Sequence, residues 1–329
     1  MNKKHEKSAC CQAVIIKYGN KRRQCVGCRR TWSVWKKRRG RKKKRIDTNL
    51  AQAFLRREIA SQIALAKQHR CSEALVQKTL QSSRDVFIRT TAWFAIPAGD
   101  LILIADGVVE MVERQWHTIY LMLVRPVSGR DAVILPPLIL PGTETASGWR
   151  KAMDTIPVSV RCRILAIVCD GHRGLVSEGF WRRWVIQRCH FHLLARIQSR
   201  RSRFRIARHQ EEARMIFKHA HAVLASTDEV AVTRALVALE DTGWQSTSPE
   251  IRKVLSGFVS QYLDYRSYLK YPDLHLPTTN NTAESLASMI ADLKRRMRGF
   301  PTFRSFERWI VALLKYKKTI ACNGFHQQN

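Results

Sequence analysis

The sequence has 329 residues, a formal net charge of +32 and a hydrophobic fraction of 45%. A charge of this size indicates a polyanionic partner, and the ordinary hydrophobic fraction excludes a disordered basic protein. The length allows two or three domains. The N-terminal region lacks a continuous apolar stretch, and no run approaches the roughly twenty apolar residues of a membrane span. We therefore expect a cytoplasmic protein rather than a secreted or membrane-bound one.

Residues 1–46 predict a small metal-binding module. Cys25 and Cys28 form a C-x-x-C knuckle, and His5, Cys10 and Cys11 precede it. Because nine cysteines without an export signal favour reduced thiols over disulfides, these side chains are candidate zinc ligands of a zinc-ribbon-like module. The first knuckle is irregular, so His5 with Cys10 or Cys11 would have to complete the four ligands.

The alternative for this module is a degenerate ribbon that binds no metal and is held by packing of Trp32 and Trp35. A strongly basic segment, KKRRGRKKKR, follows at residues 36–45. Like charges keep such a segment extended, so it can be a solvated linker, but its position between two candidate DNA-binding modules favours phosphate contact. The candidate DNA-binding residues of this region are Arg29, Arg30, Lys42, Lys43 and Lys44.

Residues 47–97 predict a helix–turn–helix and a linker. An apolar helical segment at 58–66 is followed by a polar turn and by a second helix, which Ser72 can cap. The residues expected to face inward are Leu75, Val76 and Leu80. The residues expected to face a DNA groove include Gln77 and Lys78. A plain helical hairpin fits the same pattern equally well.

Between residues 98 and 192 the pattern alternates between strands and helices. The predicted strands cover residues 101–105, 116–124, 132–138, 163–169 and 185–188. The predicted helices cover residues 143–156 and 176–184. This order predicts an α/β fold, in which helices pack against a mixed sheet.

Residues 190–270 carry mainly helical patterns, and two more helices are expected at 278–298 and 302–320. The first of these two has an apolar stripe that would bury one face of the helix. The stripe consists of Leu286, Met289, Ile290, Leu293 and Met297. The opposite face carries Glu284, Ser288, Arg295 and Arg298. One surface of this helix can therefore present a carboxylate and two arginines to a DNA backbone.

Three acidic residues stand out against the basic background. Asp106 and Asp170 each end an apolar run, in LILIADG and ILAIVCDGH, and Glu284 opens a helix in TTNNTAES. Carboxylates are the ligands that Mg²⁺ prefers, and Mn²⁺ is an alternative. Two such ions held by these three residues, with Asp106 between them, would activate water and stabilise the leaving oxygen in phosphodiester cleavage.

Each acidic residue also has a purely structural explanation. The pair Asp106-Gly107 is typical of a hairpin turn. Asp170 can cap the helix that follows its strand. Glu284 lies three residues after Asn281, as in a capping box. The combination favours bound cations, because acids gathered in so basic a protein would otherwise repel DNA.

A further motif is the C-x-x-H of Cys189 and His192. With zinc it would supply soft ligands, but only from one segment, and no second pair is obvious in the sequence. We expect a structural role, in which both side chains are hydrogen-bonded at a helix start.

Together these motifs resemble the Mutator-like superfamily of DDE transposases, in its bacterial insertion-sequence branch. The resemblance covers residues 98–320 and is carried by ADG at Asp106, VCDGH at Asp170, the C-x-x-H pair and TNNTAES with Glu284. It implies a ribonuclease-H-like core whose first part is residues 98–192, an all-helical insertion at 193–277 and core helices at 278–329. It also implies a tryptophan of the insertion near the DNA end, for which Trp244 is the candidate; a core tryptophan is the alternative.

The resemblance implies that Asp106, Asp170 and Glu284 hold metal for strand cleavage and strand transfer. The expected partners are double-stranded terminal inverted repeats and target DNA, bound by a homodimer or higher oligomer in the bacterial nucleoid. The first alternative is a nuclease of the same fold that never joins strands. The second is a non-catalytic DNA-binding regulator. An RNA-binding protein fits less well, because no aromatic stacking motif stands out.

Overall fold

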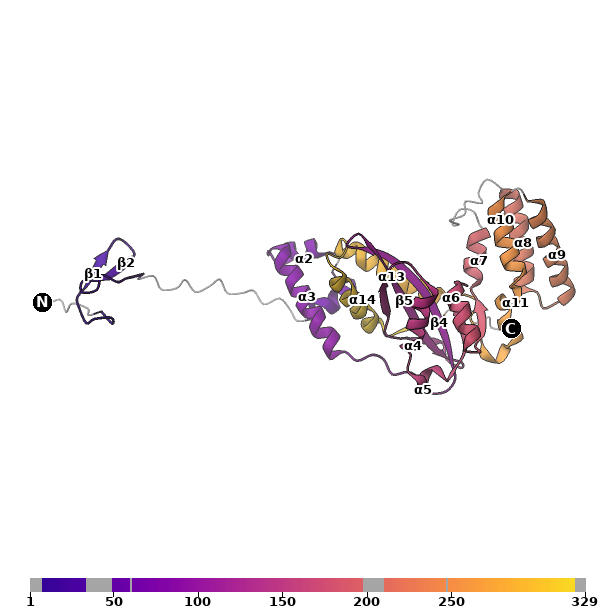
Figure 1. Cartoon of the computed structure of the whole chain (residues 1–329), viewed down its shortest axis with the longest axis horizontal. Coiled ribbons are helices and arrows are strands. Elements are labelled where there is room, and N and C mark those ends of the chain that lie inside the picture. The colour runs from indigo at the N-terminus through magenta and orange to yellow at the C-terminus, as the bar shows by residue number, and fades with distance from the viewer. Residues whose placement is uncertain (1–7, 34–48, 60, 198–209, 247, 323–329) are drawn as a thin grey trace. The chain divides into compact units, whose positions relative to one another are not determined.

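The computed structural model describes residues 8–33, 49–59, 61–197, 210–246 and 248–322. The chain divides into two compact units, Met1–Asp47 and Thr48–Asn329. Figure 1 labels their helices and strands. Each unit has its own sheet.

The first unit is a three-stranded antiparallel sheet in the order β1-β2-β3. Its strands are β1 (Ile15–Tyr18), β2 (Arg22–Cys25) and β3 (Thr31–Ser33). Within residues 8–32 only Ser8 and Cys25 are buried. These residues therefore have no apolar core, and Trp32 does not provide one because its side chain is exposed. Trp35 and His5 lie outside the described residues.

The second unit is built on a seven-stranded mixed sheet in the order β10-β6-β5-β4-β8-β9, with β7 also paired to β5. Strands β4 and β5 are antiparallel, whereas β4, β8 and β9 are parallel. The strands are β4 (Leu101–Val112), β5 (Gln115–Pro126), β6 (Asp131–Ile134), β7 (Leu138–Pro141), β8 (Ile164–Cys169), β9 (Val185–Arg188) and β10 (Thr319–Ala321).

The prediction that the first strand ends before Asp106 is wrong. Strand β4 continues to Val112, and the hairpin turn is made by Glu113 and Arg114, whose φ angles are 51° and 63°. Two consecutive residues with positive φ form the type of turn that matches the twist of a hairpin. Asp-Gly resembles such a turn locally, but the pairing of β4 with β5 passes straight through it.

The strand predicted at 132–138 is two strands, because Pro136 and Pro137 interrupt it. The strands expected near 116–124, 163–169 and 185–188 are confirmed as β5, β8 and β9. The extra strand β10 pairs with β6 at the sheet edge and was not predicted.

Helices α4 (Ala146–Asp154), α5 (Val158–Arg161) and α6 (Arg173–Trp181) accompany one face of this sheet. On that face Leu101, Leu103 and Ala105 pack with Trp149 of α4 in a continuous apolar core. Helix α4 is shorter than predicted, since Thr145 caps it by accepting a hydrogen bond from the Gly148 N–H at 3.0 Å. Helix α6 starts earlier than predicted, because His172 caps its first turn.

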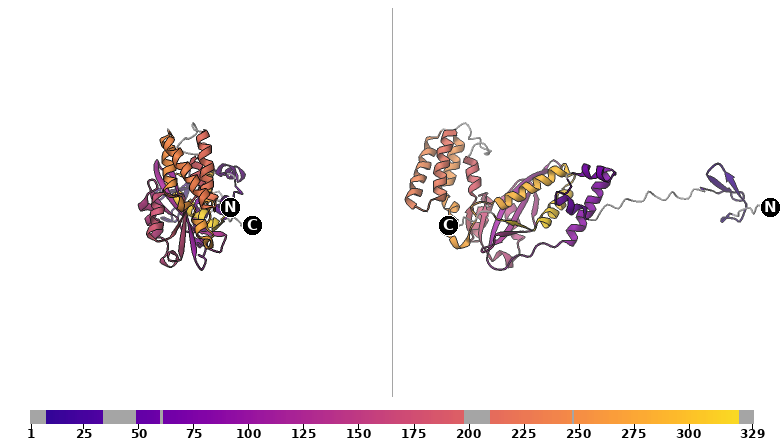
Figure 2. Two further views of the ribbon diagram at one scale, coloured as in Figure 1. Left: turned by 90° about the vertical axis from the view of Figure 1, so that its right-hand side faces the viewer. Right: turned by 180° about the vertical axis from the view of Figure 1, so that it is seen from behind.

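Helices α13 (Asn281–Met297) and α14 (Phe303–Lys317) cover the other face (Figures 1 and 2). Both predicted C-terminal helices are thereby confirmed. In the apolar stripe of α13, Met289 is half-buried, and the remaining members, Leu286, Ile290, Leu293 and Met297, are buried. Helix α13 contacts β4 and β5 directly.

Three helices begin this unit: α1 (Leu50–Leu55), α2 (Gln62–Gln68) and α3 (Glu73–Thr90). Helices α1 and α3 pack against α14, and α2 packs against α3. Ser72 caps α3 as predicted, by accepting a hydrogen bond from the Leu75 N–H at 3.3 Å. Val76 and Leu80 are buried, but Leu75 is 39% exposed, so its predicted inward position is wrong. The apolar surface of α3 is therefore narrower than the sequence pattern indicates.

Between β9 and α13 the chain is helical in its described part. The elements are α7 (His190–Ile197), α8 (Gln210–Ala225), α9 (Glu229–Gln245), α10 (Pro249–Val259), α11 (Tyr262–Tyr265), α12 (Ser267–Lys270) and the 3₁₀ turn η2 (Pro272–Leu274). Helices α8, α9 and α10 lie side by side and share one apolar core with α7 and α11 (Figures 1 and 2). Trp244 is 81% exposed, so the alternative of a core tryptophan is wrong.

The mixed sheet with helices on both faces is consistent with a ribonuclease-H-like core. No helix in the described segments combines the length and apolarity needed to cross a membrane.

Candidate active site

Asp106 lies in the middle of β4, where it pairs with Leu121 of β5. On its other side, the pairing of β4 with β8 extends only to Ile104. Successive side chains of a strand alternate between the two faces, so Asp106 lies on the face opposite Ala105 and its core. This is the face that α13 covers.

Asp170 directly follows the last residue of β8, as predicted. Its Oδ1 accepts a hydrogen bond from the His172 N–H at 2.8 Å, so it also orders the turn that leads into α6. Gly171 has a φ of 90°, and the Arg188 guanidinium occupies the space that a side chain would need. The neighbouring parallel strands β4 and β8 thus bring both aspartates to one part of the sheet.

Glu284 lies in the first turn of α13. The helix begins after Asn280, which makes no side-chain capping bond, so the predicted capping box at Asn281 is not formed. The carboxylate of Glu284 is therefore not used for capping. Because α13 packs against β4, Glu284 is carried by an element that touches the strand of Asp106.

The electrostatics connect these carboxylates. Burial raises the pKa of Asp106 well above its usual range, and the charges of Asp170, Glu144 and Glu284 raise it further. The Gly107 N–H, which donates a hydrogen bond to Asp106 Oδ1 at 2.9 Å, acts in the opposite direction. A cluster of this kind is unfavourable unless protons or cations neutralise it.

Glu144 is a fourth acid of this cluster that the sequence analysis missed. A Cβ atom on Gly107 would lie 2.6 Å from the Glu144 carboxyl carbon, so only a glycine beside Asp106 leaves room for it. Trp149 Nε1 donates a hydrogen bond to Glu144 Oε1 at 2.5 Å, and His172 Nδ1 lies 3.6 Å from the same oxygen. Burial raises the pKa of Glu144, and the charge of Asp170 raises it as well.

The sequence does carry a signal for Glu144, but an ambiguous one. Glu144 precedes a helix, where acidic residues are common because they interact favourably with the helix dipole. The sequence predicts a turn at Gly107, whereas the structure shows that this glycine provides space for the Glu144 carboxylate. Only the tertiary structure shows that Glu144 and Gly107 are in contact.

Glu284 has a second set of neighbours, the C-x-x-H pair. His192 Nδ1 lies 3.5 Å from Glu284 Oε1, and the donor atoms of Cys189, His192 and Glu284 all lie within 4.8 Å of one another. Cys189 connects β9 to α7, and His192 lies in the first turn of α7. Burial raises the pKa of Glu284, and His192 lowers it.

In the described part of the chain, two groups of at least three metal-ligating side chains have donor atoms within 4.8 Å of one another. Asp106, Asp170 and Glu284 do not form such a group, although the charge of Glu284 acts on Asp106. Their donor chemistry nevertheless fits Mg²⁺, which takes hard oxygen ligands and retains several waters between protein groups. The carboxylates can therefore hold magnesium without all touching one ion.

The second group consists of Cys10, Cys11, Cys25 and Cys28. The Sγ–Sγ distances are 3.4 Å for Cys10–Cys28, 3.3 Å for Cys11–Cys25 and 3.7 Å for Cys10–Cys11. Four sulfurs around zinc, at about 2.3 Å from the metal, lie at roughly such separations. The two adjacent cysteines thus replace the regular first knuckle, and His5 is outside the described residues.

Hydrogen bonding favours the thiolate of Cys25, whereas hydrogen bonds with Cys25 and Cys28 raise the pKa of Cys11 to about 12. The Ser8 hydroxyl lies 3.1 Å from Cys25 Sγ, and hydrogen bonds from Ser8 and from the Cys28 N–H lower the pKa of Cys25 to about 6. The thiolate is the form that binds metal. Together with the missing apolar core, this favours zinc over the alternative of a metal-free ribbon.

The candidate DNA-binding residues lie at several places. Arg29 and Arg30 are exposed between β2 and β3, while Lys42, Lys43 and Lys44 are outside the described residues. On α3, Gln77 is half-buried and Lys78 is exposed. At the end of α13, Arg298 is exposed with a φ of 57°, and Arg295 is exposed but donates a hydrogen bond to Asp292 at 2.5 Å.

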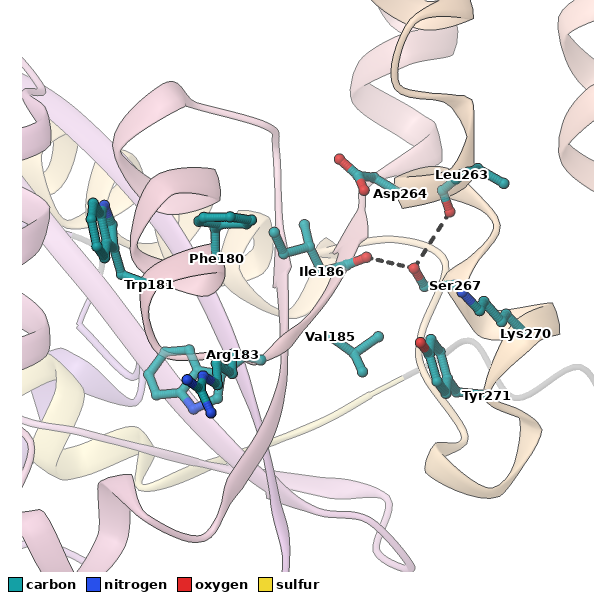
Figure 3. Close-up of a pocket in the computed structure, with 11 residues that line it drawn as sticks. Phe180, Trp181, Arg183, Val185, Ile186, Leu263, Asp264, Ser267, Lys270 and Tyr271 are labelled. Carbon is teal, nitrogen blue, oxygen red and sulfur yellow. Dashed lines mark hydrogen bonds between the residues drawn. The ribbon is translucent and has the colours of Figure 1, made fainter.

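A separate cavity of about 720 Å³ lies beside β9. Figure 3 shows Phe180 and Trp181 at the end of α6 on one side and Lys270 and Tyr271 on the other. The Ser267 hydroxyl donates a hydrogen bond to the Ile186 carbonyl at 2.6 Å and so joins the two sides. None of the four clustered acids lines this cavity, so it is distinct from the carboxylate site.

Comparison with protein families matches residues 129–319 to the model described as "Transposase, Mutator family". This is more than half of the chain. The chain belongs to the Mutator family of transposases. The matched region includes Glu144, Asp170, Glu284 and the C-x-x-H pair, while Asp106 precedes it. Family membership implies DNA transposition and DNA binding. No curated protein matches the sequence.

Proposed function

We propose that this Mutator family protein is a DDE transposase that cleaves DNA at element ends and joins the freed 3′-hydroxyl to target DNA. The observation that carries the proposal is the carboxylate cluster: the charges of Asp170 and Glu284 both act on Asp106, within a ribonuclease-H-like sheet. In so basic a chain, such a cluster is best explained by bound divalent cations.

Asp106, Asp170 and Glu284 are the proposed ligands. When bound, Mg²⁺ or Mn²⁺ would activate the attacking oxygen and stabilise the leaving oxygen of an in-line displacement. Asp106 provides a fixed oxygen, because its backbone is held within β4. Asp170 is held by the turn into α6, and Glu284 is on α13, which packs against the sheet. The scissile phosphate would lie between the sheet and this helix.

Glu144 is the proposed fourth acid of the site. Its carboxylate is held by Trp149 and lies against Gly107, one residue from Asp106. A carboxylate at this distance can bind a water of the metal ion or the ion itself. Such supporting groups commonly change metal affinity or activity 10–100-fold.

The N-terminal unit is proposed to bind zinc through Cys10, Cys11, Cys25 and Cys28 and to contact the terminal repeats. Arg29, Arg30 and the lysines at 42–44 would bind phosphates. Helices α2 and α3 are the proposed helix–turn–helix, with Gln77 and Lys78 toward DNA. The proposed organisation is a DNA-binding region at residues 1–97, a core at 98–192 and 278–329, and a helical insertion at 193–277.

The helical insertion is proposed to contact DNA near the element end. Trp244 supports this, since its exposed ring borders a cavity of about 350 Å³ together with Arg252. An aromatic ring beside a cation suits an unstacked base and its phosphate. Pairing two element ends requires a homodimer or higher oligomer on double-stranded DNA in the nucleoid.

A strand-transfer experiment tests the proposed function. Labelled, pre-cleaved terminal-repeat ends would be incubated with the full chain, Mg²⁺ and plasmid target. We expect ends joined to the plasmid with the wild type and none with Asp106→Asn, which should still bind the ends. Hydrolysis of ends without joining would identify a nuclease instead. Binding without any Mg²⁺-dependent chemistry would identify a regulator.

A further inference from the structure

Glu284 and His192 present two buried polar atoms to each other without a hydrogen bond between them. His192 Nδ1 and Glu284 Oε1 have no hydrogen-bond partner among the described residues, and their 3.5 Å separation does not make one. A buried polar atom without a partner typically costs about 1–3 kcal/mol. Two such atoms facing each other indicate that something binds between them.

Cys189 is the third residue beside His192 Nδ1 and Glu284 Oε1. Its N–H donates a hydrogen bond to the Cys169 carbonyl at 2.8 Å, and its Sγ accepts one from the Asn280 N–H at 3.4 Å. These bonds fix the sulfur between the end of β9 and the start of α13. The Sγ, the His192 ring nitrogen and the Glu284 oxygen lie within 4.8 Å of one another.

The chemical nature of these donors selects the ligand. One sulfur, one imidazole nitrogen and one carboxylate oxygen form the mixed set that suits zinc and related transition metals, whereas Mg²⁺ takes oxygen alone. Three protein ligands leave a fourth position for water. We propose that Cys189, His192 and Glu284 form a zinc-type metal site that is distinct from the Asp106–Asp170 pair and shares Glu284 with it.

The free state of Cys189 is compatible with this assignment. Burial raises the pKa of Cys189 to about 12, so without an ion it is a neutral thiol. A coordinated thiol is deprotonated, and the thiolate charge would be balanced by the ion. The ion would also provide partners for His192 Nδ1 and Glu284 Oε1.

If Glu284 is a ligand of both sites, zinc should affect cleavage; this expectation rests on the proposed transposase function. A zinc ion bound by Cys189 and His192 would hold Glu284 away from Asp106 and Asp170. Zinc should therefore inhibit Mg²⁺-dependent cleavage by the wild type. A chain without the sulfur ligand should be less sensitive to zinc.

The test measures cobalt binding to the full-length chain. The four N-terminal cysteines are first replaced together: Cys10→Ser, Cys11→Ser, Cys25→Ser and Cys28→Ser. We expect Co²⁺ added to this chain to give the near-ultraviolet absorption of a cobalt–thiolate bond at one site. Adding Cys189→Ser should remove that absorption, and adding His192→Gln should weaken Co²⁺ binding at least tenfold. Cys162→Ser, which changes an exposed cysteine, is the matched control and should have no effect.

Circular dichroism establishes that each variant is folded, and His192→Gln keeps the test decisive if Cys189→Ser does not fold. Absence of the thiolate absorption from the four-serine chain would overturn the metal site, as would equal effects of His192→Gln and Cys162→Ser. If cobalt binds as expected but zinc leaves Mg²⁺-dependent nicking unchanged, the sharing of Glu284 is wrong. If the wild type never nicks DNA, the transposase proposal fails while the cobalt result stands.

Discussion

Asp106 is held in a position that is unfavourable for its own charge. Burial and three neighbouring acids raise its pKa in the folded chain. A raised folded pKa means that stability is greatest below the unfolded pKa and is lost as the pH rises through the folded pKa. Without cations, the charged cluster therefore destabilises the protein near neutral pH.

We predict that Asp106→Asn stabilises the metal-free chain at neutral pH while abolishing Mg²⁺-dependent nicking. The expected gain is on the order of 1 kcal/mol, the scale of one uncompensated buried polar group. Thermal unfolding in EDTA should show the two chains converging near pH 4 and separating by pH 8. Added Mg²⁺ should stabilise the wild type more than the variant. A variant less stable at pH 8 in EDTA would contradict this explanation.

Glu144 permits a second prediction about single residues. Glu144→Gln keeps an acceptor for Trp149 Nε1 but removes the charge beside Asp106. We expect nicking to fall roughly 10–100-fold with little change in folding, because groups that support metal ligands act on this scale. Glu110→Gln is the control, since Glu110 is on the same strand but is paired with Lys294. Equal nicking by both variants would exclude Glu144 from the site.

For single residues, the sequence predicts which side chains are candidates for the site but not which side chains lie beside them. Asp170 and Glu284 stand out because each follows or opens a regular element. Glu144 does not, because an acid before a helix is common. The group formed by Cys189, His192 and Glu284 could not be predicted either, since Cys189 and the start of α13 at Asn280 are 91 positions apart in the sequence.

Among the elements, helix α3 depends on α14 through one carboxylate. Asp85 accepts hydrogen bonds from Arg84 Nη2 at 2.7 Å and from Arg308 Nη1 at 2.5 Å. Arg84 is only 4% exposed, so its charge needs this partner. The N-terminal helices are therefore attached to α14 by the partly exposed ion pair of Asp85 and Arg308 as well as by apolar packing.

We predict that Asp85→Ala destabilises the second unit by about 2 kcal/mol, because it removes the hydrogen-bonding partner of the buried Arg84 guanidinium. Urea unfolding followed by circular dichroism would show a lower midpoint. Glu73→Ala, at the exposed start of the same helix, is the control and should change stability by no more than about 1 kcal/mol. Similar midpoints for both variants would show that α3 does not depend on Asp85.

Most elements could be predicted from the apolar pattern, and the exceptions have specific causes. The prediction of β8 is correct because a largely buried parallel strand gives a continuous apolar run. The end of β4 is wrong because Asp106-Gly107 resembles a turn, whereas Glu113 and Arg114 adopt positive φ without any glycine. Such conformations are imposed by strand pairing, which local sequence does not encode.

The two units of the molecule differ in what stabilises them. The second unit has a large apolar core, whereas residues 8–32 bury only Ser8 and Cys25. A sheet this small needs a bound metal or a disulfide to be stable, and zinc coordination contributes folding free energy directly. The hydrophobic fraction of the sequence indicates the apolar core, and the cysteine count indicates the metal site. The set of four ligands depends on the close approach of Cys10 and Cys11, which only the structure shows.

We predict that replacing both cysteines of the C-x-x-C knuckle, Cys25→Ser with Cys28→Ser, unfolds the first unit alone. Limited proteolysis should then cut within residues 8–33, while the thermal midpoint of the second unit stays unchanged. Affinity for terminal repeats should fall, and Mg²⁺-dependent nicking of non-specific DNA should persist. Val26→Ala, an exposed change within the same knuckle, is the control. A lowered midpoint of the second unit would show that the two units are coupled.

The uninterrupted course of β4 also limits which parts of the protein can move during the reaction. Since Asp106 is embedded in a paired strand, its carboxylate cannot travel without breaking the hairpin. Glu284 instead lies in the first turn of α13. The helices between β9 and α13 leave the sheet, and the chain returns to it with α13. Under the proposed function, closure of the acids around a phosphate would therefore be a displacement of the α13 N-terminus. A crosslink that immobilised this terminus against the sheet would stop turnover even with every acid intact.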